Sequence, residues 1–106
     1  MPNLNDKPTL ADLQYYVTQL EQERGFTDGT IIQQCLKLGE EVGELFKAVR
    51  KQEKLKLDSK KEVSDTVDEE LADILIYLCS IANRYHIDLE RAFREKEEIN
   101  KTRTWQ

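Results

Sequence analysis

Two pairs of acidic residues have a type and spacing that could do chemistry. Glu41 and Glu44 are three residues apart in one stretch, and Glu70 and Asp73 are three apart in a later one. Residues three apart lie on the same face of an α-helix. Like charges at this spacing destabilise a helix unless a cation offsets them. If both stretches are helical and lie side by side, four carboxylates can converge on one cation.

The ligand types indicate which cation such a site would hold. No pair of Cys or His residues accompanies the four carboxylates, and oxygen-only ligand sets suit magnesium, manganese or calcium better than zinc or copper. The single histidine, His86, is expected to be a surface or helix-capping residue. A chain with 21 acidic residues also forms such pairs by chance on solvated helix faces. The spacing alone therefore leaves both a metal site and a solvated acidic face open.

Glu70 has the surroundings least suited to a solvated carboxylate. On a helix it shares a face with Ile74, Tyr77 and Ile81. A carboxylate among such groups is costly to bury unless another charge pairs with it. Because this stretch contains no Lys or Arg before Arg84, we expect the compensating charge to come from another segment or from a metal ion.

Helices must position these residues, and the sequence predicts four of them. Apolar residues recur at three- and four-residue spacing, and no alternating strand pattern competes. Thr9, Thr30 and Thr66 each begin a capping box, and Asp88 caps the last helix. The fold class is therefore all-α, with helices expected over residues 9–24, 30–52, 66–85 and 88–101.

Length, charge and composition bound the class of protein. At 106 residues the chain has room for one domain, expected over residues 1–106 with 1–8 as a flexible N-terminal segment. A net charge of −5 without a concentrated basic face argues against binding of duplex nucleic acid. No apolar run of about 18 residues predicts a membrane span, and the N-terminus lacks an apolar signal segment. A cytoplasmic protein is therefore expected. The basic stretch 50–61 is interpreted as the end of the second helix followed by a linker.

The cysteines and the apolar residues outside the main stripes predict buried thiols and self-association. Cys35 and Cys79 are expected to be buried free thiols, since each stands in an apolar helical pattern. Ile32 and Leu36 in the second helix, and Ile76 with Cys79 in the third, lie off the main apolar stripes. Such second faces need a partner surface, which a small domain does not readily supply. We therefore expect a homodimer or homotetramer.

The ordered motifs resemble those of the MazG-like nucleotide pyrophosphohydrolases. Residues 37–45 read Lys-Leu-Gly-Glu-Glu-Val-Gly-Glu-Leu and resemble the family's Glu-Glu-x-x-Glu motif. Residues 70–73 read Glu-Leu-Ala-Asp and resemble its Glu-x-x-Asp motif. Residues 22–26 are similar to the turn after its first helix, although Phe26 stands where the family often has tryptophan, and 96–103 are similar to its C-terminal substrate segment. The resemblance implies a four-helix MazG-like bundle, completed by packing between identical copies.

The resemblance also implies an activity and a metal. Family members cleave nucleoside triphosphates between the α and β phosphates, with magnesium, and release a monophosphate and pyrophosphate. Carried onto this chain, the resemblance assigns the metal, with manganese as a substitute for magnesium, to Glu41, Glu44, Glu70 and Asp73. It makes Glu40 and Glu41 the catalytic candidates, with Glu40 as a neighbouring group or one that orients the attacking water. It assigns substrate binding to Lys37, Lys96, Asn100 and Lys101.

Three functions remain open at this point. The first is a nucleoside triphosphate pyrophosphohydrolase that removes non-standard or excess deoxynucleotides, a house-cleaning role. The second, in the same superfamily, is a phosphoribosyl-ATP pyrophosphohydrolase that uses the same carboxylates on another nucleotide. The third is a non-enzymatic helical interaction module whose acidic residues are only solvated. The Gly-rich loop with which other nucleotide-binding proteins cradle phosphates is absent from the sequence.

Overall fold

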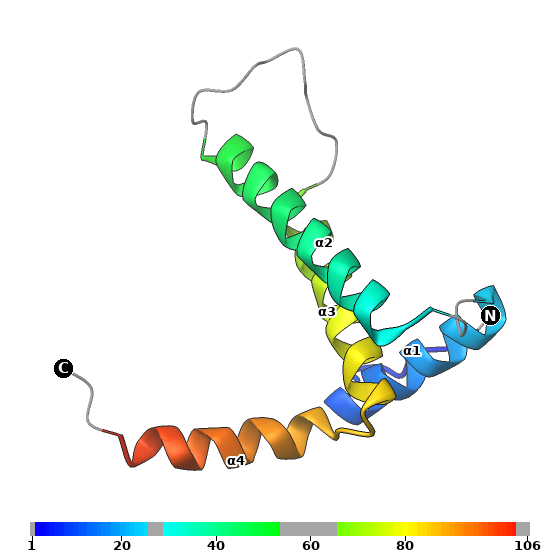
Figure 1. Cartoon of the computed structure of the whole chain (residues 1–106), viewed down its shortest axis with the longest axis vertical. Helices are drawn as coiled ribbons and strands as arrows, with labels where there is room; N and C mark the ends of the chain where they lie inside the picture. The colour runs from blue at the N-terminus through cyan, green and yellow to red at the C-terminus, as the bar shows by residue number, and fades with distance from the viewer. Residues whose placement is uncertain (1, 26–28, 54–65, 104–106) are drawn as a thin grey trace. The chain divides into compact units, whose positions relative to one another are not determined.

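The computed structural model describes residues 2–25, 29–53 and 66–103. These residues contain four helices and no strand (Figure 1), which confirms the all-α class. Each helix begins and ends within a residue or two of its predicted limits. Within the described ranges, none of the helices combines the length and apolar character that a bilayer span requires. The helices are α1 (Leu10–Arg24), α2 (Ile31–Gln52), α3 (Val67–Arg84) and α4 (Leu89–Lys101).

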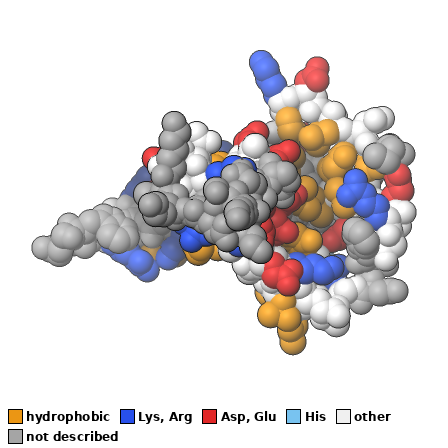
Figure 2. Space-filling view, turned by 90° about the horizontal axis from the view of Figure 1, so that it is seen from above, with side chains coloured by type: hydrophobic (Ala, Val, Ile, Leu, Met, Phe, Trp, Pro, Cys, Tyr) orange, Lys and Arg blue, Asp and Glu red, His pale blue; other side chains and the backbone are white. Residues whose placement is uncertain are grey.

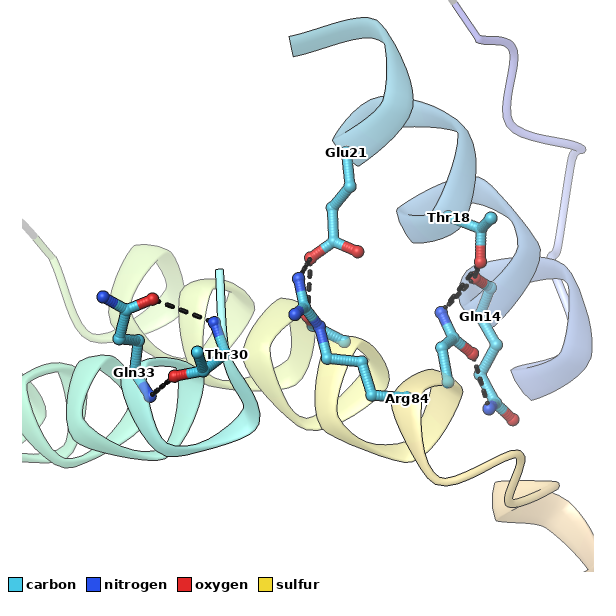
Figure 3. Close-up of polar contacts among 8 residues, drawn as sticks. Gln14, Thr18, Glu21, Thr30, Gln33 and Arg84 are labelled. Carbon is cyan, nitrogen blue, oxygen red and sulfur yellow. Dashed lines mark hydrogen bonds and ion pairs between the residues drawn. The ribbon is translucent and has the colours of Figure 1, made fainter. Parts of the chain in front are cut away.

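Side-chain caps begin the helices as the sequence predicts. Thr9 and Thr30 each accept a hydrogen bond from the backbone N–H three residues further on, and the side chain there accepts one from the cap's own N–H. Figure 3 shows this reciprocal pair for Thr30 and Gln33. Thr66 makes the same two contacts before α3, and Asp88 caps α4. These bonds satisfy N–H groups that lack a partner inside the helix.

The chain divides into two compact units. The first, which we call the α1/α4 unit, comprises Met1–Asp28 and Cys79–Gln106 and so includes the last residues of α3. The second, the α2/α3 unit, comprises Gly29–Leu78. The single domain expected over residues 1–106 stays a prediction. Phe26 and the predicted linker after residue 53 lie outside the described residues.

The hydrophobic core of the α1/α4 unit forms around one face of α1. Val17, Leu20 and Cys79 are its buried residues, and Leu89 from α4 is among the half-buried residues packed against them. Burial raises the pKa of the Cys79 thiol above its usual range. The prediction of a buried free thiol is confirmed for Cys79, which therefore belongs to this core rather than to a face that needs a partner.

The buried face of α2 differs from its apolar stripe. Cys35 is exposed, so the prediction of a buried thiol is wrong there. The buried residues of α2 are Gln34 and Ala48. They lie seven residues to either side of half-buried Glu41, and residues seven apart lie on the same helix face. The helix thus turns its Glu41 face inward.

The first part of α3 buries a carboxylate while neighbouring leucines are exposed. Glu70 is 0% exposed, whereas Leu71 is 51% exposed. Leu75 and Leu78 are exposed as well, although their spacing from Leu71 is that of a buried helix face. Figure 2 shows hydrophobic side chains at the surface beside acidic and basic ones. In this part of α3 the fully buried side chain is therefore a carboxylate, and leucines lie at the surface.

Candidate metal centre

Three carboxylates converge in the α2/α3 unit, where α2 lies beside the first part of α3 (Figure 1). Glu41 comes from α2, and Glu70 and Asp73 come from consecutive turns of α3. One oxygen of each carboxylate lies within 4.8 Å of the other two. The structure thus brings together three of the four residues that the sequence predicted as metal ligands.

Burial makes this cluster electrostatically demanding. The Glu70 side chain is 0% exposed, and Glu41 and Asp73 are half-buried around it. Two carboxylates about 5 Å apart repel each other by roughly 3 kcal/mol at an effective dielectric constant of about 20. A cation among the three carboxylates reduces this repulsion. A divalent cation offsets two charges at once and fits this arrangement.

The donor set is selective for the kind of cation. All three members of the cluster offer carboxylate oxygens, and neither thiol nor imidazole takes part. Hard cations such as magnesium, manganese and calcium prefer these ligands. Magnesium in particular is usually bound through one or two carboxylates, and its other coordination positions go to water and substrate phosphates. The cluster therefore fits a divalent ion that also contacts a phosphate-containing ligand.

The other α2 candidates lie outside the three-residue cluster. Glu44 is half-buried, and its Oε2 lies 3.7 Å from Lys47 Nζ. Glu40 and Lys37 are exposed. Their assignments as fourth ligand, water-orienting group and phosphate contact stay predictions.

The predicted substrate residues of the C-terminal segment lie on α4, in the α1/α4 unit. Lys96 and Asn100 line an open groove whose other walls include Leu10 of α1. Lys101 Nζ lies 3.2 Å from Glu98 Oε2, an exposed ion pair of little energetic weight. The lining of the groove combines the charged and polar side chains of Lys96, Glu97 and Asn100 with apolar ones. The roles of these residues in substrate binding stay predictions.

Comparison with known proteins identifies the family. Residues 29–104, most of the chain, match the family model of the MazG nucleotide pyrophosphohydrolase domain. This chain belongs to the MazG family. The matched region contains all of α2, α3 and α4, and therefore every candidate metal ligand and every candidate substrate residue.

Two crystal structures of iMazG from Vibrio DAT 722 are similar to this MazG domain. Ctag-iMazG is 34% identical, with a TM-score of 0.62, over 89% of this chain and 99% of that chain. Ntag-iMazG is 33% identical, with a TM-score of 0.62, over 92% of this chain and 99% of that one. No significant match was found among curated proteins. The family and these structures support a pyrophosphohydrolase-type function that acts on nucleotides.

Two polar clusters of this MazG domain were not predicted from the sequence. In the first (Figure 3), Ser80 Oγ donates a hydrogen bond of 2.5 Å to Glu21 Oε2, and Arg84 Nη2 lies 3.7 Å from the same oxygen. The second joins Gln14 and Asn83. Its signal in the sequence is a polar residue, Gln14, at helical spacing within the apolar face of α1 that supplies the core.

Proposed function

We propose that this MazG domain is a magnesium-dependent nucleoside triphosphate pyrophosphohydrolase. It cleaves between the α and β phosphates and releases a nucleoside monophosphate and pyrophosphate. The observation that carries the proposal is the cluster of Glu41, Glu70 and Asp73, in which a fully buried carboxylate lies among two others. A polyanionic substrate can approach an acidic protein at such a place, because a bound cation inverts the sign of the local charge.

Glu41, Glu70 and Asp73 would hold magnesium, with Glu44 as a fourth ligand and manganese as a substitute. When bound, the ion would supply positive charge to the triphosphate and favour activation of the attacking water. Glu44 can join through a change of side-chain rotamer, because its present contact with Lys47 is a partly exposed ion pair of small strength. The proposal therefore uses three ligands that already lie together and one that is adjacent on α2.

Side chains on α2 and α4 would accept the proton of the attacking water and contact the substrate. Glu41 or its neighbour Glu40 would accept the proton of the attacking water. Lys37, one turn before Glu41, would contact the phosphates. On α4, Lys96, Asn100 and Lys101 would contact phosphates, sugar or base, and a cation there would stabilise charge that develops on the leaving pyrophosphate.

The proposal includes self-association in the cytoplasm and a role in cleaning the nucleotide pool. Ile32, Leu36, Phe46 and Leu71 are each more than half exposed, which leaves a large apolar surface on the α2/α3 unit. A second copy of the chain would cover such a surface in a homodimer or homotetramer. Sedimentation equilibrium tests this part, and a monomer at micromolar concentration would contradict it.

A nucleotide panel tests the proposed activity. The protein is incubated with magnesium and each standard and modified nucleoside triphosphate, with phosphoribosyl-ATP included, and pyrophosphate is measured separately from orthophosphate. We expect pyrophosphate from at least one triphosphate and none from Glu41→Gln. Glu95→Gln, which changes an exposed carboxylate on α4, is the matched control and should retain activity.

The other outcomes of the panel discriminate the alternatives. Cleavage of phosphoribosyl-ATP alone would replace the proposed substrate class with the second one. No pyrophosphate from any nucleotide, together with unchanged stability on addition of magnesium, would contradict both enzymatic functions and leave the interaction module.

A further inference from the structure

We propose that Gln14 and Asn83 are positioning residues for substrate binding. Their amide side chains clamp the turn between α3 and α4 onto α1, and so fix the direction in which α4 carries Lys96 and Asn100. The inference rests on the proposed function, because that function assigns these two α4 residues to the substrate.

Gln14 holds the turn at two backbone groups. Its Nε2 donates hydrogen bonds to the Ile87 carbonyl (2.8 Å) and to Asn83 Oδ1 (3.0 Å), and its Oε1 accepts one from the Leu89 N–H (2.9 Å). The residue is only 9% exposed, so these bonds replace contacts with water. Both N–H donors of the amide are used, and the oxygen has a partner as well.

Asn83 completes the contact from the α3 side. Its Nδ2 donates to the Gln14 carbonyl (2.8 Å) and to Thr18 Oγ1 (3.0 Å), as the bonds drawn around Gln14 and Thr18 in Figure 3 show. Backbone groups determine the orientation of both amides, because a carbonyl only accepts and an N–H only donates. Neither side chain can be flipped without placing like groups against each other, so the network has one arrangement.

The start of α4 depends on this network. The α3 helix ends with a bond from the Ile87 N–H to the Ala82 carbonyl (2.8 Å) and with His86 at φ +56°, the left-handed conformation of a Schellman-type terminus. Asp88 then caps the N–H groups of the second and third residues of α4. The N–H of its first residue, Leu89, is bonded instead by Gln14 of α1. The direction of α4 is thereby coupled to α1.

Core packing contributes little to that direction. None of the residues of α4 is buried, and Leu89, its first residue, is the one that packs against the core cluster. Asn100 lies eleven residues beyond Leu89, which corresponds to about 16 Å along the helix axis. A pivot of about 20° at Leu89 would therefore displace Asn100 by about 6 Å, twice the length of a hydrogen bond. A small loosening of the clamp would thus shift Lys96 and Asn100 relative to α1 by more than the reach of a hydrogen bond.

A kinetic comparison tests the link to substrate binding. Gln14→Met nearly conserves the volume of the side chain and removes its three hydrogen bonds. With the triphosphate that the unaltered protein cleaves best, we expect KM to rise about 10-fold and kcat to stay within twofold, because the carboxylate cluster is unchanged. Asn83→Leu should act in the same way, and the double variant should be little worse than either single one. Gln22→Met, an exposed position on α1, is the control.

A distance measurement tests the clamp without using activity. Spin labels at Arg24→Cys and Glu95→Cys, in a Cys35→Ser background, report the separation of exposed points on α1 and α4 within one unit. We expect a narrow distance distribution that broadens in Gln14→Met and stays narrow in Gln22→Met. An unchanged distribution, an unchanged KM, or a loss of kcat in proportion to the unfolded fraction would each overturn the inference. Absence of pyrophosphate release by the unaltered protein would refute the proposed function instead.

Discussion

The two units of this MazG domain bury polar side chains in opposite ways. In the α1/α4 unit, the amides of Gln14 and Asn83 match donors to acceptors at 2.8–3.0 Å. In the α2/α3 unit, the carboxylates of Glu41, Glu70 and Asp73 place three groups of one charge within 4.8 Å of each other. The first arrangement pairs each donor with an acceptor, whereas the second gathers like charges, which we propose a cation offsets. Under this proposal, matched donors and acceptors characterise a structural polar cluster, and converging like charges characterise a cation site.

The largest expected effect concerns the cluster. Asp73→Asn keeps the size of the side chain and removes one charge and one strong ligand. We expect pyrophosphate release to fall at least ~100-fold, since even changes to groups that only support metal ligands cost about 10- to 100-fold. The measurement is kcat/KM at saturating magnesium. Asp6→Asn, at an exposed position, is the control, and equal activity of the two variants would remove Asp73 from the site.

Mutation of the clamp should lower the free energy of unfolding by the same amount with and without magnesium. Gln14→Met leaves the Ile87 carbonyl and the Leu89 N–H without their side-chain partner. We expect a loss of about 2 kcal/mol in the free energy of unfolding, against less than about 0.5 kcal/mol for exposed Gln22→Met. Urea denaturation measures both. If magnesium stabilised Gln14→Met and the unaltered protein by different amounts, the clamp and the carboxylate cluster would not be independent.

Asp12 is a carboxylate whose charge is stabilised by hydrogen-bond donors of the protein, in contrast to the carboxylate cluster, and this difference can be tested by pH. The backbone N–H of Thr9, with the side chains of Asn5 and Thr9, holds the pKa of Asp12 below its usual range. A lowered pKa stabilises the fold above the unfolded-state pKa, and this stabilisation is lost as pH falls through the folded-state value. Asp12→Asn should therefore lower the melting temperature at pH 7, and the difference from the unaltered protein should shrink below about pH 4. A difference that is constant with pH would contradict this assignment.

The smallest expected effect is at the end of α3. His86 has a positive φ, which glycine adopts with less strain. His86→Gly should raise the free energy of unfolding by about 0.5 kcal/mol, because the relief of strain slightly exceeds the added entropy of the unfolded chain. Thermal unfolding at pH 8 measures the change. A destabilised variant would show that the imidazole makes contacts that matter more than the backbone conformation.

Local signals made the helices predictable from the sequence. The boxes at Thr9 and Thr30 and the cap at Asp88 involve residues close together in the chain, and each prediction is confirmed. The buried faces were less predictable. The choice between Cys35 and Gln34 depends on what packs against α2, and apolar periodicity favoured Cys35 wrongly. Burial is decided by segments distant in sequence, which periodicity within one helix does not contain.

The residues of the candidate site also differ in how far the sequence could predict them. Glu70 was recognisable in the sequence, because a carboxylate stood among apolar helix neighbours, and the structure shows it fully buried. Its grouping with Glu41 and Asp73 follows from the spacing once α2 and α3 are adjacent. Membership of Glu44 depends on a side-chain rotamer, which spacing does not determine. Gln14 was missed because its partners are about 70 residues away in the chain.

Unfolding of the unaltered protein and of Glu70→Gln, with magnesium and with chelator, tests the central claim most directly. We predict that magnesium stabilises the unaltered protein, by about 2.7 kcal/mol at 100 times its dissociation constant. In chelator, Glu70→Gln should be about 1 kcal/mol more stable than the unaltered protein, because it removes one of three crowded like charges, and magnesium should add nothing to it. An unaltered protein that does not respond to magnesium, or a Glu70→Gln variant that is less stable in chelator, would contradict a metal site built on Glu41, Glu70 and Asp73.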